Sequence, residues 1–286
     1  MHSTAYALEM PAKRSSCVVF SSPHSGRNYT QPFLMRSVLN RDVIRSSEDA
    51  FVDQLFASAP DHGAPLIAAQ MPRAFLDLNR SADELDPALV LGARRSGHNP
   101  RVASGLGVIP RVVANGRAIY SGKLTMDEAR LRIDTYWRPY HARLKSLLAE
   151  SIDSFGQAIL VDCHSMPHEA VALAGTAHGR RPEIVLGDRF GASASGVIVD
   201  QIEAAFVAAG LTVVRNTPFA GAYVTQTYGR PARDQHAIQI EIDRALYMNE
   251  STIEPSADFD AFRAVLTRVI ADIARIGAQP ERLAAE

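Results

Sequence analysis

Short apolar runs that alternate with longer amphipathic segments are the feature that most restricts the fold of this chain. Each run stops at a turn or a polar residue, and most are rich in β-branched residues, as buried strands are. Strands that alternate with helices are typical of a three-layer α/β/α domain with a mostly parallel, mixed sheet. We therefore expect this fold class, with strands at residues 17–20, 158–163, 184–187, 211–214 and 237–241.

Three other segments have apolar stripes at helical spacing. The first covers residues 133–148, where Pro139 should kink the helix, and the second covers residues 262–273. The third covers residues 195–209 and stops at Gly210, a residue type common at helix C-caps.

A fourth helix is expected over residues 47–58. Ser46 stands where a residue could cap its first turn, and Asp49 stands three residues later, as in a capping box. In this interpretation the Asp49 carboxylate has only a capping role.

Length and composition fit a globular α/β protein. A chain of 286 residues fits one large domain or two small ones, and α/β enzymes often fill it as one. We expect a single domain over residues 1–286, with a short, flexible N-terminus at 1–13 and a C-terminal tail at 277–286. The hydrophobic fraction of 47 % supports a sizeable core. The net charge of −1 argues against nucleic acid or an anionic membrane as partner.

The sequence also favours a cytoplasmic location. Residues 1–13 have no basic region that leads into an apolar run, so they do not resemble a signal peptide. We see no apolar stretch long enough to cross a bilayer. Cys17 and Cys163 are the only cysteines, which makes a disulfide framework unexpected and favours a reducing compartment.

Polar residues stand at the ends of three expected strands. His24 follows the first strand, His164 follows the second, and Glu241 ends the last. In open α/β sheets, ligands bind beyond the carboxyl ends of the strands. These three residues are therefore the first candidates for a functional site.

A catalytic zinc site needs three protein ligands and an open position. His24, in a turn with Pro23 and Gly26, and His164 are candidate imidazole ligands. The third ligand could be Asp49 or Glu48, and Asp162 could orient a ligand from behind. On spacing alone a metal site is one interpretation, because a single histidine after a strand is more often a loop or core residue.

Two other nucleophile arrangements are disfavoured. Cys163 and His164 are adjacent at a strand end and should point to opposite faces, so Cys163 should pack as a small hydrophobe. Ser165 lies outside any Gly-x-Ser-x-Gly elbow, which argues against a serine triad.

Charged residues within apolar stretches have two interpretations each. Arg80 ends the alternating segment 77–80, which follows a strand-like run, and could clamp a carboxylate with two hydrogen bonds. Alternatively, it could pair with Asp77 or Asp83. Glu241 needs a partner or a catalytic role, because an unpaired buried carboxylate is costly, and Arg244 or another arginine could pair with it.

In several of these segments the chain resembles the N-formylglutamate amidohydrolases, also called N-formylglutamate deformylases. The resemblance extends from about Val18 to Glu250 and rests on eight segments in order. They are residues 23–27, 48–53, 77–80, 105–111, 139–141, 162–167, 187–191, and 228–231 together with 236–247.

The resemblance implies a fold related to the zinc carboxypeptidases and the aspartoacylases. By this resemblance His164 matches a zinc-binding histidine after a central strand. Asn79 and Arg80 match a pair that holds a substrate carboxylate, and Glu241 matches a general base. The relatives usually have a His-x-x-Glu motif at the first site, but here Arg27 takes the place of that glutamate. We therefore assign the carboxylate ligand to Asp49, with Glu48 in reserve.

The resemblance also implies an activity. We expect one Zn²⁺ per chain, or another divalent ion, and hydrolysis of N-formyl-L-glutamate to formate and L-glutamate in histidine degradation. Arg73 could stabilise the oxyanion. Arg111 or Arg230 could hold the second carboxylate of the substrate.

Two alternatives remain open from the sequence. One is a zinc amidase for another N-acyl amino acid or a small peptide, because a few side chains can change substrate choice. The other is a non-catalytic binding protein of the same fold. In each case the partner is a small molecule, and the chain is a monomer or a small homo-oligomer.

Overall fold

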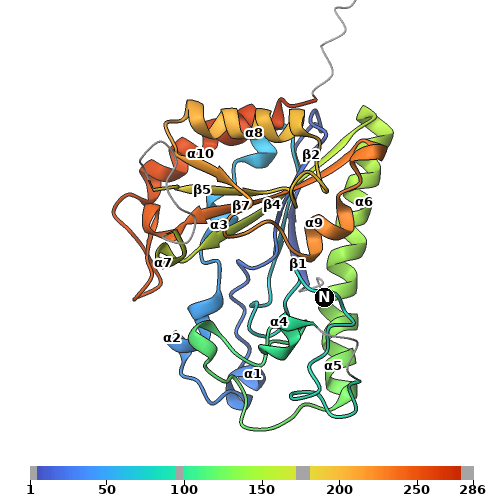
Figure 1. The fold of residues 1–286 in the computed structure, drawn as a ribbon, viewed down its shortest axis with the longest axis vertical. Helices are drawn as coiled ribbons and strands as arrows, with labels where there is room; N and C mark the ends of the chain where they lie inside the picture. Colours follow the sequence, from blue (N-terminus) through green and yellow to red (C-terminus); the bar gives the residue numbers. More distant parts are fainter. Residues whose placement is uncertain (1–4, 95–98, 172–180, 278–286) are drawn as a thin grey trace, which may run out of the picture.

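The central feature of the computed structural model is a mixed β-sheet with helices on both faces (Figure 1). The structure describes residues 5–94, 99–171 and 181–277. Within these residues the sheet has seven strands in the order β1-β3-β2-β4-β7-β5-β6. The strands are β1 (Tyr6–Glu9), β2 (Val18–Ser22), β3 (Leu66–Ala69), β4 (Ala158–Met166), β5 (Ile184–Gly187), β6 (Val213–Arg215) and β7 (Gln235–Asp243).

Most neighbouring strands run parallel. β3, β2, β4 and β7 are parallel to one another, and β6 is parallel to β5. The antiparallel pairs are β1 with β3 and β5 with β7. The expected fold class, three layers around a mostly parallel mixed sheet, is confirmed.

All five expected strands exist, and two further strands of this seven-stranded sheet were not expected. β1 is an edge strand of four residues within the stretch 1–13, which we expected to be flexible. β3 is also four residues long, and two of them are alanines with low strand propensity. The strand-like run before Asp77 is not a strand, because β3 ends at Ala69.

Two hydrophobic cores lie on opposite faces of the sheet, and alternate strand residues contribute to each. On β2, Val18 and Phe20 belong to one core and Val19 to the other. The first core is covered by α3 (Val52–Leu55), α8 (Gly196–Ala208) and α10 (Phe259–Ala274). The second is covered by α6 (Arg138–Phe155) and α9 (Tyr223–Tyr228).

Three expected helices agree with the structure. α8 and α10 match two of them, and Gly210 has the positive φ of +86° that suits a residue after a helix end. The third begins with a π-helical turn at Ile133–Trp137 and continues as α6. The regular α-helical pattern is thus interrupted directly before Pro139.

The prediction of a helix over residues 47–58 is wrong. A 3₁₀ turn, Arg45–Ser47, is followed by extended backbone, and the four-residue α3 begins only at Val52. Phe51 before it has a left-handed φ of 66°. Ser46 is not an N-cap, since its Oγ donates to Val43 O.

The remaining elements are short, and several build the region below the sheet in Figure 1. Its hydrophobic residues belong to the second core. Within the described residues, no helix is long and apolar enough to span a membrane. The remaining short elements are α1 (Gln31–Arg36), α2 (Arg41–Ile44), α4 (Pro100–Ala103), α5 (Met126–Arg132), α7 (His168–Val171), β8 (Met248–Asn249) and β9 (Glu254–Pro255).

Candidate active site

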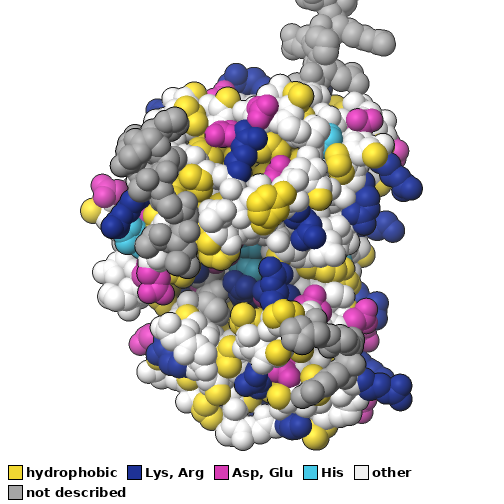
Figure 2. Space-filling view, viewed as in Figure 1, with side chains coloured by type: hydrophobic (Ala, Val, Ile, Leu, Met, Phe, Trp, Pro, Cys, Tyr) yellow, Lys and Arg dark blue, Asp and Glu magenta, His cyan; other side chains and the backbone are white. Residues whose placement is uncertain are grey.

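A pocket of about 780 Å³ opens at the carboxyl ends of β2, β4 and β7. Figure 2 shows a hollow at the middle of the molecule, with a histidine visible in it and basic side chains beside it. Loop residues within 101–116 and 218–222 also line the pocket. This volume is within the usual range for small-molecule sites.

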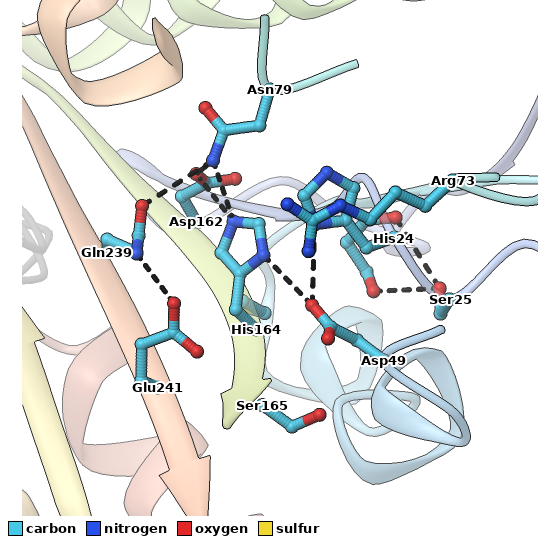
Figure 3. Close-up of polar contacts among 12 residues, drawn as sticks. His24, Ser25, Asp49, Arg73, Asn79, Asp162, His164, Ser165, Gln239 and Glu241 are labelled. Carbon is cyan, nitrogen blue, oxygen red and sulfur yellow. Dashed lines mark hydrogen bonds and ion pairs between the residues drawn. The ribbon is translucent and has the colours of Figure 1, made fainter. Parts of the chain in front are cut away.

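Two histidines and one carboxylate meet in the depth of this pocket. His24, Asp49 and His164 are all buried, and one potential ligand atom from each lies within 4.8 Å of the others. Figure 3 shows Asp49 between the two imidazoles. His24 follows β2, His164 lies on β4, and Asp49 lies in the loop before α3.

The Nδ1 atoms of both histidines face Asp49. His164 Nδ1 lies 3.0 Å from Asp49 Oδ2, and His24 Nδ1 lies 3.4 Å from the same oxygen. Although it is buried, His24 Nδ1 has no hydrogen-bond partner among the residues that the structure describes. An unsatisfied buried nitrogen is costly, so a group that accepts its lone pair would stabilise this arrangement. The donor set of two imidazoles and one carboxylate fits a divalent metal such as zinc.

The opposite nitrogens of the two rings are held by other carboxylates. His24 Nε2 lies 2.7 Å from Asp77 Oδ1, and His164 Nε2 lies 2.9 Å from Asp162 Oδ2. Such contacts fix the tautomer and orientation of metal-binding histidines. The sequence led us to expect this role for Asp162 but not for Asp77.

Close packing positions the His24 turn. A Cβ atom on Gly26 would lie 2.1 Å from Met71 O, so only glycine lets this turn approach the backbone after β3. Asn28 N donates to Gln70 O at 3.0 Å across the same contact. The Asp49 N–H donates to His24 O at 3.1 Å and thereby joins the two ligand loops.

The negative charges of the carboxylates and the positive charges of the imidazoles in the cluster stabilise one another. Burial by itself raises the pKa of Asp49, but the hydrogen bond with His164 and the charges of His164 and His24 outweigh it and hold that pKa well below its usual range. Burial lowers the pKa of His164, but the charge and hydrogen bond of Asp162 outweigh it and raise the pKa well above the usual range. A cation would complement the carboxylates at this position.

Glu48 does not join the cluster. Its carboxylate accepts hydrogen bonds from Tyr29 Oη and Arg45 Nε at 3.1 and 3.0 Å. Asp49 Oδ1 accepts a hydrogen bond from Arg244 Nη2 at 3.0 Å. The structure thus brings Asp49, rather than the reserve candidate Glu48, to the two histidines.

Glu241 lies beside the cluster on the neighbouring strand. It is the register partner of His164, so the two side chains emerge on the same face. Gln239 Nε2 donates to Glu241 Oε1 at 2.7 Å, as Figure 3 shows. Burial raises the pKa of Glu241 to about 7, with the His164 charge opposing. A carboxylate with this pKa can exchange a proton near neutral pH.

Arg244 does not pair with Glu241, contrary to one of our alternatives. Its guanidinium donates to Asp49, to Ser165 Oγ at 3.1 Å and to Glu48 O at 2.9 Å. Arg244 therefore anchors the loop that carries Asp49. We did not expect this role, although an arginine directly after a buried strand was a signal.

Arg73 and Arg80 reach the pocket in different ways. Arg73 Nε donates to Asp77 Oδ2 at 3.0 Å. Arg80 Nε donates to Leu106 O and its Nη1 to Asn79 O, at 2.9 and 2.7 Å. Arg80 forms no ion pair within residues 5–94, 99–171 and 181–277, so neither Asp77 nor Asp83 pairs with it there.

Asn79 is fixed by the surrounding backbone and side chains. Its Oδ1 accepts a hydrogen bond from Val224 N at 2.8 Å, which turns Nδ2 towards Asp162 Oδ2 and Gln239 Oε1. Gln239 thus connects Asn79 with Glu241, and we did not identify it from the sequence.

The structure does not bring Arg111 and Arg230 into the pocket. Arg111 Nε donates to Asp86 Oδ2 at 2.8 Å, and neither arginine is among the residues that line the pocket. Arg230 Nη1 donates to Gln226 O at 2.9 Å. Arg101, which we did not select from the sequence, lines the pocket instead.

Cys163 and Ser165 do not form a nucleophile pair with His164. Cys163 is fully buried in the core on the other face of β4, and burial raises the pKa of its thiol well above the usual range. Cys163 therefore packs as a small hydrophobe, as expected.

Sequence comparisons point to one family. The family model of N-formylglutamate amidohydrolase matches residues 16–248. N-formylglutamate deformylase from Pseudomonas aeruginosa is 31 % identical over 258 residues, which cover 88 % of this chain and 91 % of that protein. N-formylglutamate deformylase from Pseudomonas putida is 30 % identical over 239 residues, which cover 82 % of each.

Structural comparisons agree. The crystal structure of N-formylglutamate amidohydrolase from Ralstonia eutropha has a TM-score of 0.88 and 34 % identity, covering 96 % of this chain and 98 % of that one. A gene product from Agrobacterium tumefaciens shares the fold, with a TM-score of 0.62 and 20 % identity, covering 94 % of this chain and 96 % of that one.

Proposed function

The chain belongs to the N-formylglutamate amidohydrolase family, and on that basis we propose that it hydrolyses N-formyl-L-glutamate to formate and L-glutamate. It is an amidohydrolase whose pocket suits a small molecule. The observation that carries the proposal is the cluster of His24, Asp49 and His164 beside the buried carboxylate of Glu241.

We propose that His24 Nδ1, Asp49 and His164 Nδ1 hold one divalent metal ion. The unpartnered His24 Nδ1 and the carboxylates behind both rings support this ligand set. Zinc suits these donors, although other divalent ions also bind such sites. When bound, the metal would polarise the formyl carbonyl and lower the pKa of a water from about 15.7 towards roughly 7.

Glu241 would be the general base. Its place beside His164 and its pKa of about 7 support proton uptake from the attacking water and later delivery to the leaving amine. The hydrogen bond from Gln239 orients the carboxylate, because it occupies Oε1 and leaves Oε2 for the reaction.

Arginine side chains would bind the charges of the substrate and of the transition state. Arg80, which has no carboxylate partner among the described residues, would hold the α-carboxylate together with Asn79. Arg73 would stabilise the developing oxyanion, since a fixed cation there lowers the barrier. Asp77 holds the Arg73 guanidinium in place.

A substrate screen with metal analysis tests this proposal. The purified protein, loaded with Zn²⁺, is offered N-formyl, N-acetyl and N-succinyl derivatives of glutamate and of neutral amino acids. We expect N-formyl-L-glutamate to be the best substrate, with release of formate, and a metal content that falls with activity on chelation. If the protein prefers another N-acyl amino acid, the proposed substrate is wrong. If it hydrolyses none of these amides, the proposed activity is wrong and a non-catalytic binding protein is the better interpretation.

We further propose a cytoplasmic protein that acts in histidine degradation, as a monomer or a small homo-oligomer. Cys17 and Cys163 are both free and buried, which is compatible with a reducing compartment.

A further inference from the structure

Arg101 is a pocket arginine without a counter-charge. It lies on α4 (Pro100–Ala103), lines the pocket and is exposed. The part of the chain that the structure describes offers it no ion pair. Asn99 Oδ1 accepts hydrogen bonds from Arg101 N and Val102 N and so fixes the start of its turn.

The loop that carries Arg101 is held in a defined shape. Leu106 N donates to Arg101 O, and Arg111 N donates to Gly105 O, both at 2.8 Å. A Cβ atom on Gly105, whose φ is +84°, would lie 3.2 Å from Arg111 Nη2. Arg111, anchored by Asp86, therefore braces this loop from outside the pocket.

The same loop also contacts Arg80. Leu106 O, which accepts from Arg80 Nε at 2.9 Å, belongs to the turn that Arg101 begins. Burial lowers the pKa of Arg80, and the charges of Arg73 and Arg101 lower it further, while Asp77 opposes them. Arg80 and Arg101 are thus two like charges at one end of the pocket.

The pocket has an excess of cations. Within the described residues, its charged lining consists of four arginines and three carboxylates. Arg73 pairs with Asp77 and Arg244 pairs with Asp49, whereas Glu241 lies beside the metal cluster. Two separate cationic groups, Arg80 and Arg101, therefore remain for the substrate. The charged residues that line the pocket are Arg73, Arg80, Arg101, Arg244, Asp49, Asp77 and Glu241.

We propose that Arg101 binds the second carboxylate of a dicarboxylic substrate and thereby selects N-acyl derivatives of acidic amino acids. This inference rests on the proposed function and names the residue that determines its specificity. It assigns Arg111 to the support of the Arg101 loop, in place of the direct contact expected from the sequence.

The test compares N-formyl-L-glutamate with N-formyl-L-glutamine, which has the same shape but lacks the second charge. kcat/KM for both is measured for the metal-loaded wild type, Arg101→Gln and Arg268→Gln. Arg268 is exposed on α10 and does not line the pocket, so its variant removes the same charge elsewhere. We expect Arg101→Gln to lower the preference for glutamate by about 10-fold to 100-fold, mainly through KM, and Arg268→Gln to keep it. Arg101→Lys should restore part of the preference.

An unchanged preference in Arg101→Gln would overturn the inference and leave the proposed function intact. Binding of glutarate, a dicarboxylate that is not hydrolysed, gives a readout that needs no turnover. Calorimetry should show weaker binding of glutarate to Arg101→Gln than to the wild type and Arg268→Gln. Equal affinity of all three proteins for glutarate would overturn the inference, whether or not the wild type hydrolyses a formyl substrate. Absence of hydrolysis by the wild type would contradict the proposed function instead.

Discussion

At the scale of single residues, Asp77 and Asp162 decide which nitrogen of each histidine faces the centre of the cluster. Both carboxylates contact Nε2 atoms, at 2.7 Å for His24 and 2.9 Å for His164. The Nδ1 atoms are thereby left to face Asp49. The strand-end histidines could be predicted from the sequence, but their orientation could not, because Asp77 is distant from His24 along the chain.

We expect Asp77→Asn to weaken metal affinity by about 10-fold to 100-fold, because the amide is a poorer partner for the His24 imidazole. Competition with a chelating dye measures this change. Asp83→Asn, an exposed site on the same segment, is the control and should bind metal as the wild type does. Equal affinity in the two variants would show that Asp77 does not orient His24.

At the scale of elements, the failure of the expected helix over residues 47–58 has a clear cause. The local sequence allowed a capped helix, but Asp49 instead contacts two imidazoles and Arg244 from distant segments of the chain. These tertiary contacts outweigh local propensity. The five predicted strands could be recognised from their apolar, mostly β-branched composition. In contrast, β1 is only partly buried and two of the four residues of β3 are alanines, so neither has a clear strand pattern in the sequence.

The start of α6 supports the loop that carries Asn79 and Arg80. His141 Nε2 donates to Leu78 O, and Trp137 Nε1 donates to Arg80 O, both at 2.9 Å. His141 Nδ1 accepts a hydrogen bond from Tyr228 Oη at 2.9 Å. The buried imidazole must therefore be neutral to accept this bond.

This arrangement predicts acid sensitivity. Burial lowers the pKa of His141 to about 4, with the bond to Leu78 opposing. In the unfolded chain His141 takes up a proton near pH 6.5, whereas in the folded protein it stays neutral until about pH 4. The contribution of the neutral imidazole to stability is therefore complete above pH 6.5 and is lost as the pH falls towards 4. We expect this group to reduce the free energy of unfolding of the metal-free protein by about 2 kcal/mol between pH 7 and pH 5.

Urea unfolding at both pH values checks this, with His141→Gln as control. The glutamine amide can donate to Leu78 O but does not titrate, so the variant should lose less stability on acidification. The neighbouring Tyr140, Tyr223 and Tyr228 have raised pKa values and stay neutral throughout this range. An equal loss in both proteins would assign the acid sensitivity to other groups.

At the scale of the whole molecule, the site forms where the sheet meets the loops below it. His24, Asp49 and His164 come from three separate segments and meet only in the folded chain. The strand-end rule was sufficient to find His24, His164 and Glu241 from the sequence. It could not find Arg101 or exclude Arg111 and Arg230, because the shape of the loops determines which arginines reach the pocket.

Because the ligands come from distant segments, metal binding should stabilise the folded protein. A metal at about 100 times its Kd would add about 2.7 kcal/mol, which raises Tm by roughly 4 to 5 °C for a chain of this size. Thermal unfolding with Zn²⁺ and with a chelator measures the shift. A Tm that does not respond to metal in the wild type would argue against a site that the fold assembles.

The His24, Asp49 and His164 cluster would hold the metal while Glu241 performs the proton transfer. The most direct test measures bound metal per chain and the turnover of N-formyl-L-glutamate in the wild type, Glu241→Gln and His164→Ala. We expect Glu241→Gln to keep its metal but lose turnover by about 100-fold to 10,000-fold, and His164→Ala to lose both. Full metal content in His164→Ala, or near-normal turnover in Glu241→Gln, would contradict the account.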